Sequence, residues 1–157
     1  MPLIEIHTLI KAPPERCFDL SRSIDLHADS VSHTGEQAVR GTCTGLIGMG
    51  ESVTWRARHF GVWQYLTSKI TAYDRPHMFV DEMQEGVFDS FTHHHLFKPH
   101  PEGTLMTDLF RYRSPLGLAG RLADILFLTQ YMRTLLTTRN RAIMNIAESD
   151  RYMSYLL

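Results

Sequence analysis

The sequence has little cysteine, no long hydrophobic run and no excess of charge of either sign. Its 2 cysteines, Cys17 and Cys43, stand far apart, which gives neither a disulfide framework nor the spacing of a metal site. The longest apolar patch, residues 122–128, is interrupted by Asp124 and falls far short of the roughly 20 residues that a membrane span needs. The first residues lack the pattern of a secretory signal. These absences predict a reduced, cytoplasmic chain without a membrane span.

Charge and glycine content exclude two further classes of function. The 16 basic and 17 acidic residues are interspersed and give a formal charge of -1, so the basic field that nucleic-acid binding needs is not visible. The glycine-rich tract over residues 35–50 lacks the lysine and the following helix of a phosphate-binding loop. With 157 residues, of which 43% are hydrophobic, the chain can bury one core. We expect a single domain over residues 1–148, a C-terminal tail over 149–157, and no nucleic-acid partner.

Hydrophobic periodicity predicts one strand, two short helices, six further strands and one long helix. Residues 3–11 alternate as a strand, and Pro13 and Pro14 end it and suit the start of a short helix. A second short helix is expected over residues 24–30. From about Leu116 the period lengthens and predicts a helix of about eight or nine turns, entered at Ser114 and Pro115 and ending near Ala147. Its predicted inward stripe is Leu118, Leu122, Ile125, Met132, Leu135, Leu136, Ile143 and Ile146.

Three consecutive histidines lie within the strand-like run from Phe91 to Phe97. Because successive side chains of a strand point to opposite faces, His93 and His95 share a face with the two phenylalanines, and His94 lies on the other face. The segment over residues 104–112 alternates in the same way after the turn-like residues 99–103. An antiparallel hairpin, joined by a strand over residues 77–84, predicts these opposed pairs: Phe97–Met106, His95–Asp108, His93–Phe110, Asp81–His93 and Phe79–His95.

Titratable groups are rarely placed on an apolar face without a partner, because a stranded charge there costs several kcal/mol. The face that holds Asp81, His93, His95 and Asp108 is otherwise aromatic and methionine-rich. We therefore predict that this face is the functional interior. Trp63 and Tyr65 are expected to be core or cavity-wall aromatics, whereas His27 and His59 are expected on the surface or in loops.

The order of elements resembles that of the SRPBCC superfamily, which includes START-related, birch-pollen-allergen-like and polyketide cyclase/dehydrase-like proteins. The resemblance rests on the element order, the run Phe79-Val80-Asp81-Glu82, the following Gly86-Val87-Phe88, the histidine strand, and residues 103–108. It covers nearly the whole chain and is nearest to small bacterial ligand-binding members. It implies an α+β helix-grip fold, in which a curved antiparallel sheet of about seven strands wraps around the C-terminal helix, with two short helices after the first strand.

Members of this superfamily typically enclose a cavity between the sheet and the long helix, so the resemblance implies a pocket lined by the predicted face. Such pockets are apolar with a few placed polar groups. The predicted function is binding of a small hydrophobic or amphipathic molecule, such as a lipid, polyketide or aromatic metabolite. The predicted ligand-contacting residues are Trp55, Phe79, Asp81, Met83, Phe91, His93, His95, Phe97, Met106, Asp108, Phe110, Tyr112, Leu128, Met132 and Leu135.

Alternative interpretations of the polar residues remain open. The histidines and aspartates could form a hydrogen-bonded ladder that only satisfies itself. As a second alternative, His93 or His95 would act as acid and base in a cyclase/dehydratase-like enzyme, oriented by Asp108 or Asp81. Two histidines and a carboxylate also match the ligand inventory of a metal site. The resemblance implies no metal, however, so neither a metal nor a cofactor is expected.

The C-terminal tail, residues 149–157, is apolar for an exposed chain end. Exposed apolar patches tend to mark contacts, so the tail predicts docking on the domain or contact with a second copy of the chain in a homodimer. A module that binds a protein partner without a small-molecule ligand is therefore a further alternative.

Overall fold

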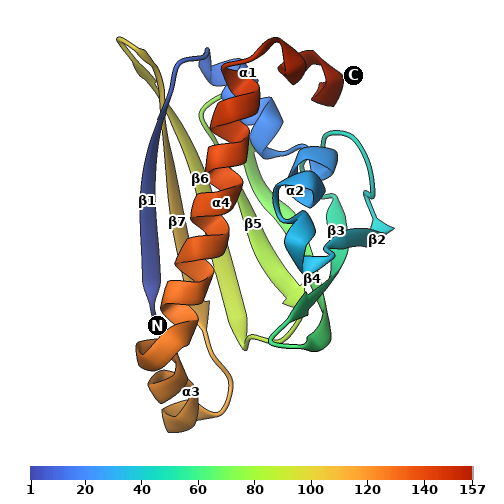
Figure 1. The fold of residues 1–157 in the computed structure, drawn as a ribbon, viewed down its shortest axis with the longest axis vertical. Coiled ribbons are helices and arrows are strands. Elements are labelled where there is room, and N and C mark those ends of the chain that lie inside the picture. Colours follow the sequence, from blue (N-terminus) through green and yellow to red (C-terminus); the bar gives the residue numbers. More distant parts are fainter. Residues whose placement is uncertain (157) are drawn as a thin grey trace.

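Seven strands form one antiparallel sheet in the computed structural model, which describes residues 1–156 (Figure 1). The strands are β1 (Leu3–Ile10), β2 (Gln37–Gly41), β3 (Ser52–His59), β4 (Val62–Asp74), β5 (Met78–Glu85), β6 (Ser90–His100) and β7 (Gly103–Arg113). Their order across the sheet is β1-β7-β6-β5-β4-β3-β2, so β1 pairs with β7 and the remaining neighbours are consecutive. The predicted seven-stranded helix-grip fold is confirmed.

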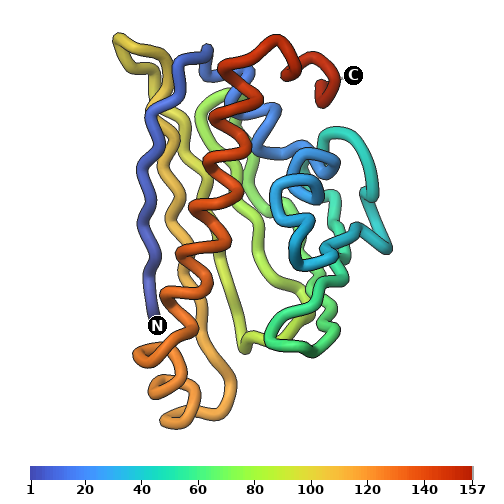
Figure 2. Tube along the Cα trace, viewed as in Figure 1, coloured from blue at the N-terminus to red at the C-terminus, as the bar shows by residue number. Residues whose placement is uncertain are grey.

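Breaks in strand register bend the half of the sheet that holds β2 to β5. One shift separates Ala38 from Arg40 in β2, and the β4–β5 pair carries two more, at Thr67/Ser68 with the extra residue in β5 and between Ile70 and Ala72 in β4. An extra residue in one strand bends that strand and increases its twist. The Cα trace in Figure 2 shows the β3–β4 region turned away from the direction of β1 and β7. One face of the bent sheet therefore curves around the helices that pack against it.

Two short helices close one end of the sheet. Helix α1 (Pro14–Ser21) begins with a proline, which needs no hydrogen-bond acceptor there, and α2 (Ile24–Ser30) is capped by the Ser23 hydroxyl, which accepts from the Leu26 amide at 3.2 Å. Phe18 of α1 is fully buried, with its ring centroid 5.3 Å from that of Phe79, of Phe97 and of Tyr73. A 3-10 turn, η1 (Ser32–Thr34), follows α2.

The long C-terminal helix lies lengthwise across the sheet (Figure 1) and has three parts. They are α3 (Gly117–Ala123), the π-helical turn η2 (Asp124–Leu128) and α4 (Thr129–Ala147). Leu136, Ile143 and Ile146 of α4 are buried as predicted. The start of the helix differs from the prediction, because Leu118, Leu122 and Ile125 are exposed.

The π-turn explains this difference. A π-turn accommodates one extra residue, and each residue of an α-helix turns the chain by about 100°. Residues ahead of η2 are therefore rotated out of phase with the stripe on α4, so Gly120 and Asp124 are buried instead. Ser114 does not cap the helix as expected. Its hydroxyl donates to the Asp124 carboxylate at 2.5 Å, and Leu116 holds the N-cap position without a side-chain bond.

The described part of the C-terminal tail packs on its own domain. Residues Asp150–Tyr155 form a 3-10 helix, η3, and the Arg16 guanidinium lies 3.7 Å from the centre of the Tyr152 ring. The Tyr155 hydroxyl donates to Asp29 of α2 at 2.7 Å. Docking on the domain is thus the predicted alternative that these contacts support. Leu157, the last residue of the predicted tail, lies outside the described residues.

Asp19 of α1 joins the two short helices to the β4–β5 turn. Its carboxylate lies 2.9 Å from the Arg22 guanidinium and 2.7 Å from that of Arg75. Burial alone would raise the pKa of Asp19, but the hydrogen bonds from Arg75 and Arg22 outweigh it, so the pKa is lowered.

This lowered pKa predicts an acid-dependent contribution to stability. A carboxyl whose pKa is lower in the folded than in the unfolded chain stabilises the fold above its unfolded pKa of about 4, and this contribution is lost as the pH falls through the folded value. We expect Asp19→Asn to lower the free energy of unfolding by about 1 kcal/mol at pH 7. The deficit should shrink below about pH 4. Urea denaturation across pH checks this, with the exposed Asp89→Asn as control. A deficit that is the same at pH 7 and pH 3 would contradict the assignment.

Candidate functional site

The predicted strand registers bring the polar residues together. His93 pairs with Phe110 and His95 with Asp108 across β6 and β7, while Asp81 pairs with His93 and Phe79 with His95 across β5 and β6. The predicted pair Phe97–Met106 is also present. All of these registers are confirmed. Each histidine nevertheless makes its shortest side-chain bond diagonally, to the aspartate that is not directly opposite.

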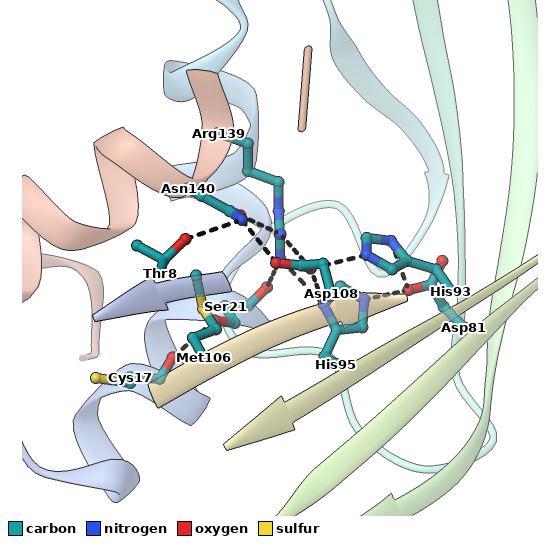
Figure 3. A network of polar contacts seen from close by, with 10 residues as sticks. All are labelled: Thr8, Cys17, Ser21, Asp81, His93, His95, Met106, Asp108, Arg139 and Asn140. Carbon is teal, nitrogen blue, oxygen red and sulfur yellow. Dashed lines mark hydrogen bonds and ion pairs between the residues drawn. The ribbon is translucent and has the colours of Figure 1, made fainter. Parts of the chain in front are cut away.

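Asp108 is the centre of this network (Figure 3). Its side chain is fully buried, and its carboxylate accepts from His93 Nε2 at 2.8 Å and from Asn140 Nδ2 at 2.6 Å. Arg139 Nη1 approaches the same carboxylate at 3.4 Å. Asn140 also lies 3.4 Å from the Thr8 hydroxyl of β1. One carboxylate therefore connects β7, β6 and α4, and through Asn140 it reaches β1.

Asp81 forms the second half of the network. Its carboxylate accepts from His95 Nε2 at 2.6 Å. The other ring nitrogen of His95, Nδ1, lies 3.4 Å from Arg139 Nη2, which also donates to the Ser21 carbonyl at 3.1 Å. The buried guanidinium of Arg139 thereby links Asp108 directly, and Asp81 through His95, to Ser21 of α1.

Arg139 and Asn140 are not among the predicted site residues, although the sequence holds a signal for them. They occupy the helical positions between Leu136 and Ile143, which belong to the predicted inward stripe. The stripe is therefore polar only where it faces the polar residues of the sheet. A polar interruption in an apolar helical stripe is the signal that points to these two residues.

Burial and hydrogen bonds set the protonation of the network. Burial lowers the pKa of His93 to about 4, with repulsion from His95 adding to it, so His93 is neutral at pH 7. Burial would raise the pKa of Asp108, but the hydrogen bonds from the two histidines dominate and hold it well below its usual range. The pKa of Asp81 is likewise lowered, because the bond from His95 outweighs burial. Both aspartates are therefore ionised.

The tautomers follow from these partners. Neutral His93 donates from Nε2 to ionised Asp108, so its Nδ1 carries the lone pair. His95 Nε2 donates to ionised Asp81 at 2.6 Å, whereas its Nδ1 lies 3.4 Å both from the Arg139 guanidinium and from the Asp108 carboxylate. No buried side-chain nitrogen or oxygen within residues 1–156 lacks a partner. The network satisfies itself, as the predicted ladder would.

The network also borders a cavity of about 390 Å³ between the sheet and the helices. Asp81 retains 18% of its side-chain exposure towards this space, and His93, His95 and Arg139 line it too. The rim includes the exposed residues Phe60, Tyr65 and Val87. The predicted ligand-contacting residues that line the cavity are Trp55, Phe79, Asp81, Phe91, His93, His95, Phe110, Leu128, Met132 and Leu135.

The other predicted residues, Met83, Phe97, Met106, Asp108 and Tyr112, do not line the cavity. Phe97 and Met106 lie beneath α1, where Phe18 packs on Phe97 and the Ser21 hydroxyl meets the Met106 sulfur at 3.4 Å. Asp108 is covered by its own partners. Tyr112 bonds Thr129 at 2.8 Å, and Met83 packs against a second apolar cluster that includes Tyr112 and Phe91. Alternation predicts the face of a side chain but not what covers it.

Two histidines expected on the surface or in loops line the cavity instead. His27 lies 2.7 Å from Glu36 and stacks on Trp55 at a centroid distance of 4.3 Å, while His59 Nδ1 lies 2.5 Å from the Tyr131 hydroxyl. Desolvation lowers the pKa of His59. Trp63, expected in the core or cavity wall, is 47% exposed and carries the Arg56 guanidinium on its ring.

Among the described residues, Asp81, His93 and His95 form the one group whose ligating atoms lie within metal-site distance of each other, all within 4.8 Å. The inventory noted in the sequence therefore comes together in space. The same residues are also placed for hydrogen bonding or proton transfer to a molecule in the cavity. No helix within residues 1–156 is long and apolar enough to cross a membrane.

No protein-family model and no curated protein matches the sequence. Solved structures do match. The protein TTHA0849 of Thermus thermophilus shares 19% identity over 98% of both chains, with a TM-score of 0.75. Ginseng major latex-like protein 151 of Panax ginseng shares 17% identity over 94% of this chain and 98% of its own, with a TM-score of 0.67. Ara h 8.0201 shares 14% identity over 92% and 98%, with a TM-score of 0.64.

These neighbours include Bet v1-like proteins of the SRPBCC superfamily. The chain thus has the helix-grip fold that the sequence resemblance implied. At this level of identity the likeness carries the fold alone, and the function has to be argued from the site.

The buried guanidinium yields a direct stability prediction. We expect Arg139→Met to lower the free energy of unfolding by about 3 kcal/mol, because it removes the cation beside the fully buried carboxylate of Asp108. The matched change Arg141→Met, at an exposed position of the same helix, should stay within about 0.5 kcal/mol of the wild type. Urea denaturation at pH 7 measures both. A loss at position 139 no larger than that at 141 would contradict a structural role for this cation.

Proposed function

We propose that the protein binds one small hydrophobic or amphipathic molecule in the cavity between the sheet and α4. The cavity itself is the observation that carries this proposal. Its volume of about 390 Å³ lies within the range of small-molecule sites, roughly 300–1,000 Å³. Apolar side chains such as Phe91, Phe110 and Leu135 line the cavity, and polar side chains stand among them. This is the composition by which binding pockets hold and orient a ligand.

The polar residues define the hydrogen-bonding group that the ligand would carry. Ionised Asp81 presents acceptor oxygens to the cavity, and neutral His93 retains an acceptor nitrogen. A hydroxyl or another donor on an otherwise apolar lipid, polyketide or aromatic molecule is complementary to these acceptors. Arg139 also lines the cavity, but its guanidinium is occupied by bonds within the protein.

Binding of an apolar probe tests this proposal. Neutral N-phenyl-1-naphthylamine should bind with a stoichiometry of one and gain fluorescence. Leu135→Trp adds bulk to the cavity wall and should weaken binding by about tenfold or more, since overpacking costs about 1–3 kcal/mol. Thr134→Trp places the same side chain at an exposed position of α4 and should leave binding unchanged. Equal affinities for the two variants, or no binding by the wild type, would refute a ligand cavity. Native mass spectrometry can reveal a co-purifying compound.

A cyclase/dehydratase-like enzyme is the second candidate, and the short bond of 2.6 Å between His95 and Asp81 at the cavity wall favours it. A carboxylate that orients an imidazole increases its basicity, which suits removal of a proton next to a carbonyl group.

This candidate predicts exchange of carbon-bound protons. In D₂O, the protein should accelerate deuterium incorporation next to the carbonyl of an aromatic ketone such as 1-indanone, as followed by NMR. His95→Gln should lose that acceleration, and His94→Gln, on the opposite face of β6, should keep it. Acceleration that survives in His95→Gln would remove this residue from the mechanism.

A further inference from the structure

The two histidines of the cavity wall share an arrangement that hydrogen bonding alone does not require. Each ring turns one nitrogen to Asp108: His93 Nε2 lies at 2.8 Å and His95 Nδ1 at 3.4 Å from the same oxygen, Oδ1. Each ring turns its other nitrogen to Asp81: His95 Nε2 lies at 2.6 Å and His93 Nδ1 at 3.9 Å from Oδ2. The rings are adjacent, with centroids 3.8 Å apart. Both imidazoles thus turn one nitrogen towards the Asp81 carboxylate, and the Asp108 carboxylate lies on the other side of both rings.

This is the pattern of a metal site with its supporting shell. A histidine that binds a metal through one nitrogen almost always donates from the other to a carboxylate or carbonyl, which fixes the tautomer and raises the basicity of the ligand. Asp108 can play this part for both rings at once. It is held in place by Asn140 at 2.6 Å and is fully buried, so it is shielded from the cavity.

The distances suit an ion between the three remaining donor atoms. Zinc is bound by nitrogen and oxygen at about 2.0–2.2 Å, so neighbouring ligand atoms of a tetrahedral site lie about 3.3 Å apart. The separations of 2.6 and 3.9 Å from Asp81 to the two rings bracket that value. A small rotation of the Asp81 carboxylate would equalise them. All three residues line the cavity, so a further coordination position would open towards it.

Tautomer and charge are compatible with an ion. His95 Nδ1 lies 3.4 Å both from Arg139 Nη2 and from Asp108 Oδ1, so the hydrogen can pass from Nε2 to Nδ1 and be donated to Asp108 without movement of the ring. With neutral imidazoles, the two aspartates and Arg139 leave one net negative charge. A divalent cation would change this to one net positive charge, which an anionic oxygen of a molecule in the cavity could offset.

We propose that Asp81, His93 and His95 bind a divalent first-row transition-metal ion at the cavity wall, with Asp108 orienting both histidines. The ligand set of two histidines and one carboxylate with an open position suits zinc or iron(II). The inference departs from the expectation, drawn from the sequence resemblance, that no metal is bound. It does not rest on the proposed ligand binding, which the apolar probe tests in chelator-treated protein.

Titration of the untagged, chelator-treated protein with Zn²⁺ and Co²⁺ tests the site. Calorimetry should find one ion per chain, and Co²⁺ should give the visible absorption of a low-coordinate site. Asp81→Asn and His95→Gln should each weaken binding by about 100-fold or more, and Asp108→Asn by about 10- to 100-fold. The control is His94→Ala, because His94 lies between the two ligands in sequence but on the other face of β6; its affinity should equal that of the wild type.

Long-range ¹H–¹⁵N spectra of the wild type decide the question without a variant, in case a substitution prevents folding. On addition of Zn²⁺, two of the 9 histidines should lose the signature of a free nitrogen, and both should carry their hydrogen on the nitrogen that faces Asp108. Absence of Zn²⁺ and Co²⁺ binding, affinity unchanged in His95→Gln, or spectral changes confined to other histidines would overturn the proposal.

Discussion

The buried carboxylate of Asp108 is the constraint on which the interior depends. An ionised group without exposure to water is tolerated only when it is paired and fully hydrogen-bonded. Asp108 meets this condition through His93, Arg139 and Asn140, which come from β6 and α4. These bonds fix the position of α4 relative to β6 and β7 at the height of Asp108. An apolar contact would tolerate sliding, whereas these directional bonds do not.

This polar layer separates two apolar clusters along the same elements. Phe91, Phe110 and Leu136 belong to the cluster on one side, and Phe97, Met106 and Ile143 belong to the cluster on the other. Phe18 packs on Phe79 and Phe97, so side chains fill the space between the short helices and that end of the sheet. Register shifts in β2, β4 and β5 bend the other half of the sheet, and the cavity lies between that half and α4.

Much of this arrangement could be predicted from the sequence because strand alternation is a local property. The pairing of His95 with Asp108 and of Asp81 with His93 follows from alternation and turn positions. The bonds of Arg139 and Asn140 to that face depend on how the helix is placed across the sheet, which no local pattern encodes. For the same reason, alternation put Phe97 and Met106 on the correct face, but it could not show that α1 covers them. His27 of α2 and His59 at the end of β3 reach the cavity wall through tertiary packing, which the local pattern of the chain does not encode.

The π-turn at Asp124–Leu128 also bears on how this chain should be compared with others of its fold. Since one extra residue shifts the helix by about 100°, residues on the two sides of the turn follow different phases of the same repeat. An ungapped alignment with a chain that lacks the turn would match outward Leu122 with an inward position. A correct alignment needs a single-residue gap within a helix, where gaps are ordinarily penalised most. Structural superposition, which does not depend on periodicity, is the safer basis for equating residues ahead of this turn.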